Sequence, residues 1–209
     1  MLSQWVIRGT AVSAICAVLT SIALAQAQQP DLPSDIPEKF TPASGDFDFS
    51  KRDAMIPMRD GVKLHTVIMV PKGIPQAPMM LERTPYGASK AASRSESSHL
   101  SAVLPRGDDV ISLSGYILVF QDVRGKFGSE GSYVMNRPLR GALNGSATDH
   151  ATDTWDTIDW LTKNVKESNG RVGMIGTSYG GFLVLMALVN PHPAPVSYTH
   201  LTLPTILRV

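Results

Sequence analysis

Hydrophobic residues in the first half of the chain occur in short runs broken by polar residues and turns. Residues 55–58 and 62–70 flank the turn Arg59-Asp60-Gly61. They predict a β-hairpin, because Asp-Gly favours the positive backbone angles of tight hairpin turns. Residues 79–82 predict a third short strand, and residues 91–104 predict a helix.

The pattern changes after Gly115, where hydrophobic runs become continuous. Residues 116–120 are entirely apolar or aromatic, as in a strand buried on both faces. Thr152 or Asp153 is the expected N-cap of the helix that follows. Strands alternate with helices over residues 116–120, 152–164, 171–175 and 180–189. This alternation predicts the α/β fold class, with a mostly parallel sheet covered by helices.

The first 27 residues read as a secretory signal peptide. One positive charge precedes an apolar run over residues 9–24, and Ala23, Ala25 and Ala27 have the A-x-A spacing of a cleavage site. An uncleaved anchor helix is the alternative, but the run is shorter than the ~20 apolar residues that a span needs. We expect cleavage after Ala25 or Ala27 and a periplasmic or secreted protein.

Composition narrows the chemistry of the remaining chain. Residues 28–50 contain four prolines among small and acidic residues, which predicts an extended arm. Cys16, the only cysteine, lies in the predicted signal peptide, so a thiol mechanism and a Cys-based metal site are excluded from the mature chain. A net charge of +1 without a basic block argues against nucleic acid as a partner.

The strongest chemical signal is Gly176-Thr177-Ser178-Tyr179-Gly180, which follows an apolar strand and precedes an apolar helix. This context is the strand–turn–helix that a G-x-S-x-G nucleophile elbow requires. Small residues on both sides allow a tight turn that exposes the Ser178 hydroxyl, and the helix N-terminus offers N–H groups to an oxyanion. A Gly-Ser turn without chemistry is the alternative.

Several ordered motifs resemble one family, the CocE/NonD hydrolases, which are related to the Xaa-Pro dipeptidyl peptidases. Within it the chain is most similar to the α-amino acid ester hydrolases, although these often carry an acidic residue at the position of Gly180. The motifs are Arg83-Thr84-Pro85-Tyr86, Asp122-Val123-Arg124-Gly125 with Ser129 and Gly131, Asp159-Trp160-Leu161, Gly176-Thr177-Ser178-Tyr179 and Asn190-Pro191-His192-Pro193-Ala194.

The resemblance implies roles for three residues and no cofactor or metal. Ser178 would be the nucleophile, and the backbone N–H of Tyr179 and the hydroxyl of Tyr86 would be the oxyanion donors. An exposed loop tyrosine is the alternative for Tyr86. Asp122 and Arg124 follow a buried strand and are expected to form a structural pair that fixes a loop.

The chain lacks an acid and a base in the expected order, which is Ser, then Asp or Glu, then His. After Ser178 the sequence contains no Asp or Glu, and His192 follows the elbow helix too soon to return over the sheet. His200 lies in residues 196–205, which resemble a translated sequencing adapter, with a C-terminal strand as the alternative.

The expected organisation is therefore a signal peptide (1–27), an arm (28–50), a partial α/β-hydrolase catalytic domain (51–195) and a non-biological tail (196–209). The chain as written is expected neither to fold stably nor to catalyse.

The expected function is hydrolysis of esters or amides through an acyl-enzyme, with α-amino acid esters and α-amino β-lactams as substrates. A general carboxylesterase or an Xaa-Pro peptidase relative is the alternative enzyme. A hydrolase-fold protein that only binds ligands is the alternative of another class. The expected partner is a small ester or amide, with no membrane after signal cleavage, and a homo-oligomer is left open.

Overall fold

The computed structural model describes residues 46–104, 109–194 and 196–201. The predicted signal peptide, the predicted arm up to residue 45 and residues 202–209 of the predicted tail lie outside the described residues. Across the described ranges, no helix has the length and apolar character needed to cross a membrane.

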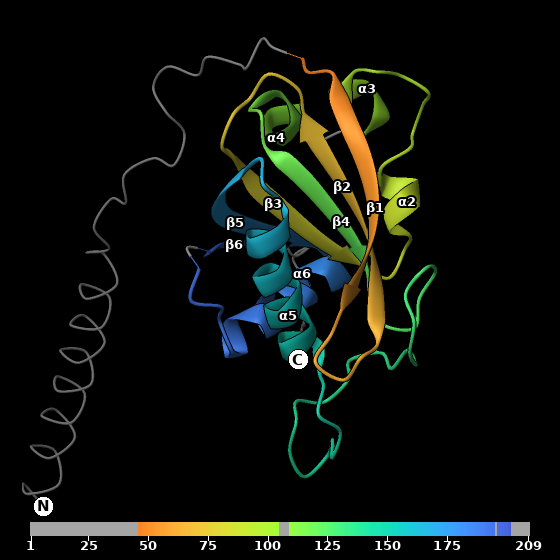
Figure 1. Ribbon diagram of the computed structural model, residues 1–209. Helices are drawn as coiled ribbons and strands as arrows, with labels where there is room; N and C mark the ends of the chain where they lie inside the picture. Colours follow the sequence, from red (N-terminus) through yellow and green to blue (C-terminus); the bar gives the residue numbers. More distant parts are fainter. Residues whose placement is uncertain (1–45, 105–108, 195, 202–209) are drawn as a thin grey trace, which may run out of the picture. The chain divides into compact units, whose positions relative to one another are not determined.

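Six strands form one mixed sheet in the order β1-β2-β4-β3-β5-β6 (Figure 1). β1 pairs antiparallel with β2, and β2 pairs antiparallel with β4. The remaining pairs, β4–β3, β3–β5 and β5–β6, are parallel. The strands are β1 (Phe49–Pro57), β2 (Lys63–Pro71), β3 (Ala77–Thr84), β4 (Ile117–Asp122), β5 (Ser168–Thr177) and β6 (Val196–Leu201).

Helices cover both faces of this sheet. α5 (His150–Asn164) and α6 (Tyr179–Val189) pack on one face, while α2 (Ala88–Ala91) and α3 (Leu100–Val103) pack on the other. α4 (Asp109–Leu113) precedes β4. The predicted α/β class, a mostly parallel sheet with covering helices, is confirmed.

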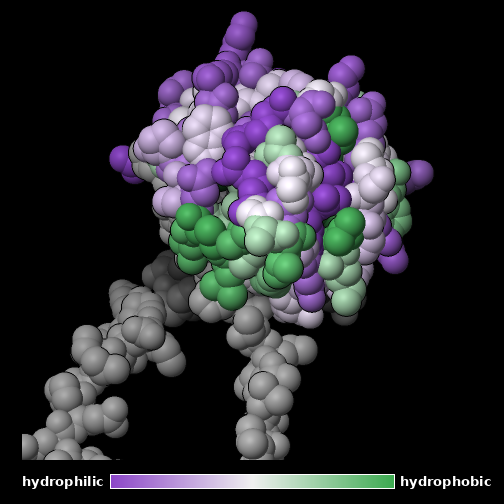
Figure 2. Space-filling model, turned by 90° about the horizontal axis from the view of Figure 1, so that it is seen from below, coloured by the Kyte–Doolittle hydropathy of each residue, from purple (hydrophilic) through white to green (hydrophobic). Residues whose placement is uncertain are grey.

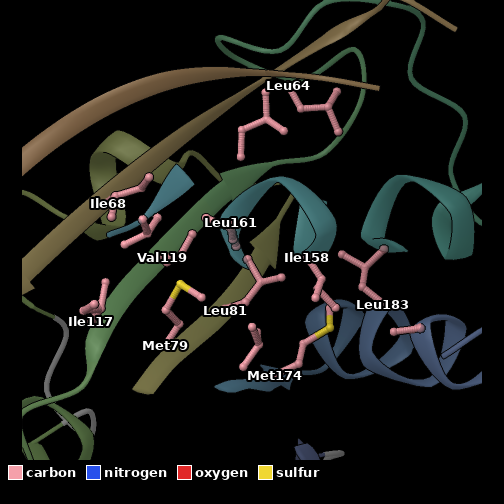
Figure 3. Packing of buried hydrophobic residues seen from close by; sticks show 14 of the residues in the cluster. Leu64, Ile68, Met79, Leu81, Ile117, Val119, Ile158, Leu161, Met174 and Leu183 are labelled. Carbon is pink, nitrogen blue, oxygen red and sulfur yellow. The ribbon is translucent and has the colours of Figure 1, made fainter. Parts of the chain in front are cut away.

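Alternation along the central strands divides the core into two clusters. Ile68 and Val119 point to the α5 and α6 side, whereas Val67, Met69 and Leu118 point to the α2 and α3 side. A period of two is the geometry of a strand buried on both faces. In Figure 3 the larger cluster joins β2, β3, β4 and β5 to the two long helices through Leu64, Ile68, Met79, Leu81, Ile117, Val119, Ile158, Leu161, Met174 and Leu183.

The predicted hairpin is present, and its first strand is longer than expected. β1 begins at Phe49, so the last two residues of the predicted arm belong to the sheet. The predicted helix over residues 91–104 is wrong, because only its two ends are helical. Between them the hydroxyl of Ser95 donates to the carbonyl of Ala102 at 2.7 Å, and the Arg94 side chain donates to the same carbonyl. Such local side-chain bonds compete with a helical backbone.

The predicted N-cap of the long helix is also wrong. α5 begins at His150, and Asp149, four residues before Asp153, caps it by accepting the Thr152 N–H at 2.8 Å. The Thr152 hydroxyl accepts the Asp149 N–H in return, which completes a capping box. Gly170 lies within β5 with a positive φ of 78°.

The segment that we predict to be a non-biological tail contains β6. Its first residue, Val196, lies opposite Val172 of β5 in a parallel pair. Residues 196–201 therefore form the C-terminal strand that we named as the alternative. The origin of residues 196–209 from a sequencing adapter stays a prediction.

Candidate active site

Ser178 lies in a strained turn between β5 and α6. Its backbone angles are φ 56° and ψ −119°, a region that residues with a Cβ rarely adopt. Ser178 itself is exposed, whereas the flanking Gly176 and Gly180 are buried. The strained turn thus leaves Ser178 accessible between two buried glycines, the setting that a nucleophile elbow requires.

Close backbone packing explains why the first residue of the motif, Gly176, has no side chain. A Cβ added to Gly176 would lie 2.3 Å from the carbonyl carbon and oxygen of Gly180. A Cβ added to Gly180 would meet only the Arg83 carbonyl oxygen, at an ordinary 3.8 Å. The strand end and the first helical turn therefore touch directly at Gly176, and this contact keeps the turn closed.

The N-terminus of α6 supplies hydrogen-bond donors beside Ser178. The first helical bond runs from the Phe182 N–H to the Ser178 carbonyl at 3.1 Å. The N–H groups of Tyr179 and the two residues after it therefore precede the first bonded turn and have no acceptor within the helix. The Tyr179 N–H is thus placed to bind an anion next to Ser178.

Tyr86 reaches the same edge of the sheet from the neighbouring strand. β3 and β5 are parallel with Leu81 opposite Met174, so Thr84 and Thr177 end the two strands side by side. Tyr86 and Ser178 follow those strand ends by one or two residues. The carboxyl edge of an open parallel sheet is where such folds bind ligands, and the Tyr86 side chain is 63% exposed there.

The loop that carries Tyr86 is held by hydrogen bonds at both ends. The Tyr86 N–H donates to the Thr84 hydroxyl at 3.0 Å, and the Thr84 carbonyl accepts the Val123 N–H at 3.0 Å. Beyond the tyrosine, the Ala88 N–H donates to Asp122 Oδ1 at 2.7 Å. The exposed ring therefore stands on a fixed backbone.

The Tyr179 phenol belongs to a polar cluster that the sequence did not indicate. It accepts the Asn136 N–H at 3.2 Å, makes a hydrogen bond with the Tyr133 side chain and lies 3.5 Å from His150 Nε2. Burial and the bond to Tyr179 raise the pKa of Tyr133 to about 12. Tyr133 and Asn136 come from the long segment between β4 and α5, whose irregular sequence carries no periodic signal.

His150 is buried beneath this cluster and stays neutral. Its side chain packs edge-on against the rings of Tyr179 and Phe182, and only 4% of the residue is exposed. Burial, followed by the positive charge of Arg83, lowers the pKa of His150 to about 3. A ring with that pKa is a poor general base at neutral pH.

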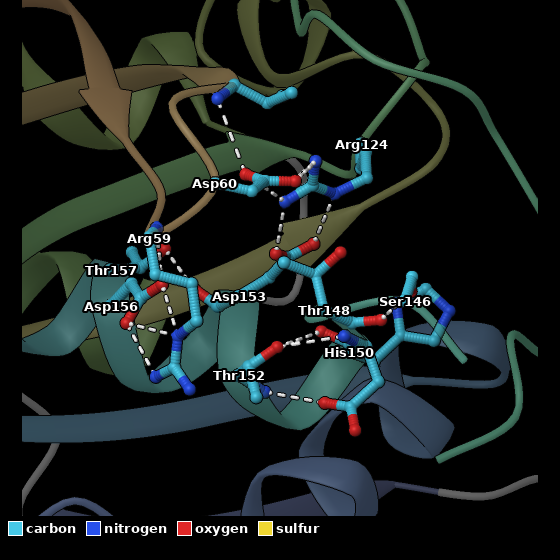
Figure 4. Close-up of polar contacts among 12 residues, drawn as sticks. Arg59, Asp60, Arg124, Ser146, Thr148, His150, Thr152, Asp153, Asp156 and Thr157 are labelled. Atoms are coloured by element: carbon cyan, nitrogen blue, oxygen red, sulfur yellow. Dashed lines mark hydrogen bonds and ion pairs between the residues drawn. The ribbon is translucent and has the colours of Figure 1, made fainter. Parts of the chain in front are cut away.

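A buried ionic network lies under the loops of the site. Arg124 binds Asp153 of α5 at 2.7 Å and Asp60 of the hairpin turn at 2.8 Å (Figure 4). Burial alone would lower the pKa of Arg124, but these carboxylates raise it above its usual range. Asp122 and Arg124 do fix loops as expected, but the expected pairing between them is wrong, because each binds other partners.

Comparison with known proteins decides the family. The profile of the X-Pro dipeptidyl-peptidase (S15) family matches residues 60–200, more than half of the sequence. The chain belongs to the S15 family. The sequence is also 32% identical over 138 residues to cocaine esterase of Rhodococcus sp. (strain MB1 Bresler), covering 66% of this chain and 21% of the esterase.

Two solved structures resemble this S15-family chain more strongly. An α-amino acid ester hydrolase is 61% identical with a TM-score of 0.71, and the match covers 82% of this chain and 28% of that one. An aminopeptidase from the marine sediment archaeon Thaumarchaeota archaeon is 57% identical, with the same TM-score and the same coverage. The predicted resemblance is confirmed, and the chain spans about a quarter of the length of these relatives.

Besides His150, three histidines of this S15 chain contact residues other than Ser178. His65 binds Asp122 and Asp53, His99 lies near Asp48, and His192 packs against Trp155 with a ring-centroid distance of 4.6 Å. The roles predicted for Ser178, Tyr86 and Tyr179 stay predictions.

Two further features bear on what the site could bind. Val134 and Met135, which lie between two contacts of the Tyr179 phenol, are 42% and 66% exposed. Figure 2 shows hydrophobic residues gathered among hydrophilic ones on the lower face of the molecule.

Within the described ranges, no group of three or more His, Cys, Asp or Glu side chains could hold a metal ion.

Proposed function

We propose that the whole protein hydrolyses esters or amides through an acyl-enzyme on Ser178, and that its substrates carry an α-amino group beside the scissile carbonyl. The observation that carries this proposal is the strained, exposed Ser178 at the N-terminus of α6. A serine held in a costly conformation at an exposed strand–helix turn fits a nucleophile better than a structural turn.

In the proposed reaction the Ser178 hydroxyl oxygen attacks the substrate carbonyl carbon, and its proton passes to a histidine base. The carbonyl oxygen becomes an oxyanion that accepts from the Tyr179 N–H and from the Tyr86 hydroxyl. Collapse breaks the bond to the alcohol or amine, which leaves with the proton from the histidine. Water then attacks the acyl-enzyme by the same route and releases the acid.

The base and its acidic partner belong to the proposal rather than to the described residues. Chain order in α/β-hydrolases places the acid and then the histidine after the nucleophile. The sequence has no Asp or Glu after Ser178. We therefore expect these two groups from further residues of the whole protein, whose solved relatives are longer than this chain.

The substrate class is supported by what two of the similar solved structures share. One is an α-amino acid ester hydrolase and the other is an aminopeptidase. Both names imply a free amino group next to the reacting acyl carbon, with an ester leaving group in one case and an amine in the other. We propose the same α-amino acyl group for this protein, including α-amino β-lactams.

The test compares matched substrates with the whole protein. Phenylglycine methyl ester and phenylacetic acid methyl ester differ only in the α-amino group. We expect kcat/KM to be at least about tenfold higher for the first, because a site built to bind a polar group rejects the analogue that lacks it. Mass spectrometry of quenched enzyme should show the acyl adduct on Ser178, and Ser178→Ala should show none.

Three results would redirect the proposal. Equal kcat/KM for both esters would favour a general carboxylesterase. Faster cleavage of an Xaa-Pro amide than of either ester would favour a dipeptidyl peptidase. Turnover that survives in Ser178→Ala would remove the nucleophile assignment altogether.

A further inference from the structure

One buried carboxylate outside the proposed catalytic groups touches three separate segments around the Tyr86 loop. Asp122 ends β4, directly opposite Thr84 at the end of β3. The residue is 1% exposed, and its two side-chain oxygens accept three hydrogen bonds. A carboxylate buried this deeply persists only when donors surround it.

The three donors come from different parts of the chain. Asp122 Oδ1 accepts the Ala88 N–H at 2.7 Å, which fixes the residue two positions after Tyr86. Asp122 Oδ2 accepts from His65 Nδ1 of β2 at 2.9 Å and from the Gly128 N–H at 3.3 Å.

The donors on Oδ2 are themselves held in place. His65 Nε2 lies 3.1 Å from Asp53 of β1, so the ring is fastened at both nitrogens. A Cβ on Gly128 would lie 2.7 Å from His65 Cγ, so this glycine packs directly on the ring. The carboxylate therefore cannot rotate away from Ala88 without losing two other bonds.

We propose that Asp122 is a positioning residue for the oxyanion donor: it holds the turn 84–88 so that the Tyr86 hydroxyl stays aimed at the substrate carbonyl oxygen. This inference rests on the proposed role of Tyr86. The exposed phenol contributes only if its backbone is fixed, because an oxyanion donor must be in place before charge develops. Asp122 fixes the loop after the tyrosine, and the Val123 N–H fixes it before the tyrosine.

Asp122→Asn is the sharpest perturbation of this arrangement. The amide has the same shape but only one acceptor oxygen, so its NH₂ group must face at least one of the three N–H donors. The backbone bond between Val123 and Thr84 remains, so the variant keeps one anchor of the loop. We expect kcat to fall by about 10- to 100-fold with little change in KM, since small misplacements and lost oxyanion donors cost rates of this order.

The test is a double-mutant cycle in the whole protein, with kcat and KM measured on phenylglycine methyl ester. The four proteins are wild type, Tyr86→Phe, Asp122→Asn and the double variant. If Asp122 acts through the phenol, its substitution should cost less than about threefold when Tyr86 is already Phe. Glu167→Gln, which removes an exposed carboxylate paired with Arg52, is the matched control and should leave kcat unchanged.

The outcomes separate this inference from the proposed function. An unchanged kcat in Tyr86→Phe would refute the donor role of Tyr86, and the inference would fall with it. A normal loss in Tyr86→Phe together with the same fold loss from Asp122→Asn in both backgrounds would overturn only the inference. Asp122 would then support the fold without acting through Tyr86.

A second pair of variants decides the matter if Asp122→Asn does not fold. His65→Ala removes one donor to Asp122, whereas His65→Asn keeps a side-chain N–H near the position of Nδ1. The inference expects a lower kcat in His65→Ala and recovery in His65→Asn, and neither change should alter kcat in the Tyr86→Phe background. Equal kcat loss in both histidine variants, or the same loss without Tyr86, would refute it.

Discussion

The contact between Gly176 and Gly180 gives the most direct test of the elbow. A methyl group at Gly176 would lie 2.3 Å from two backbone atoms of Gly180, where real Cβ atoms need more than 3 Å. Backbone atoms cannot rotate aside as a side chain can. Gly176→Ala must therefore move the start of α6 away from the end of β5, and Ser178 lies on the segment that joins them.

The size of the effect follows from the displacement. Relieving the clash requires a shift of about 1 Å, and overpacking of this kind costs about 1–3 kcal/mol of stability. A misplacement of about 1 Å at a reacting group can lower the rate by about 100-fold. Both losses should appear together, because one movement causes them.

The same substitution four residues later is the control for stability. A Cβ at Gly180 has only an ordinary 3.8 Å contact, and its φ is not positive. Gly180→Ala should therefore melt at or slightly above the wild-type temperature, since alanine favours helix over glycine by about 1 kcal/mol. Thermal melts of the two variants of the whole protein are compared, with kcat measured for Gly176→Ala. Equal melting of Gly176→Ala and wild type would refute the packing argument.

Three other predictions follow. Ser178→Gly should melt at a higher temperature than Ser178→Ala, because glycine adopts φ 56° without strain worth about 1–3 kcal/mol; equal melting would mean that the turn stores no strain. Acid should destabilise the protein through His150, whose pKa is about 3 in the folded state and near 6.5 in the unfolded state. The contribution of the neutral ring to the free energy of unfolding is therefore complete above pH 6.5 and is lost as the pH falls toward 3. Melts between pH 7.5 and 4.5 should show this slope, and His150→Gln should flatten it; an unchanged slope would contradict the assignment. Expressed with its own leader in a bacterium with a periplasm, the protein should start near Gln26 or Gln28 by mass spectrometry, and an intact Met1 would contradict export.

The sequence predicts best those elements whose cause lies within a few residues. The Asp60-Gly61 turn, the apolar run of β4 and the strand–Ser178–helix order each carry a local signal. The sheet class follows from their alternation. The sequence predicts the elbow for the same reason, since Gly176, Ser178 and Gly180 lie within five consecutive residues.

The prediction of local elements is wrong where a side chain hydrogen-bonds to a partner that the hydrophobic pattern does not indicate. The predicted helix over residues 91–104 is wrong because the side chains of Arg94 and Ser95 donate to the backbone carbonyl of Ala102. Asp149 rather than Thr152 or Asp153 caps α5, although Asp is among the preferred N-cap residues and Asp149 could have been considered. Tyr133, whose phenol binds Tyr179, had no readable signal at all.

The residues that support the site come from different strands, and the local sequence pattern therefore does not predict them. Thr84 and Asp122 end β3 and β4, and Ser178 directly follows the adjacent parallel strand β5, so residues separated by about 40–90 positions meet at one edge. A strained backbone such as that of Ser178 persists only where its surroundings fix it more than once. Here Gly176 closes the turn from within β5, while Asp122 and Val123 fix the neighbouring Tyr86 loop from β4. Five contiguous residues are thus enough to predict a nucleophile at Ser178, but the residues that support its turn depend on the strand order, which only the fold supplies.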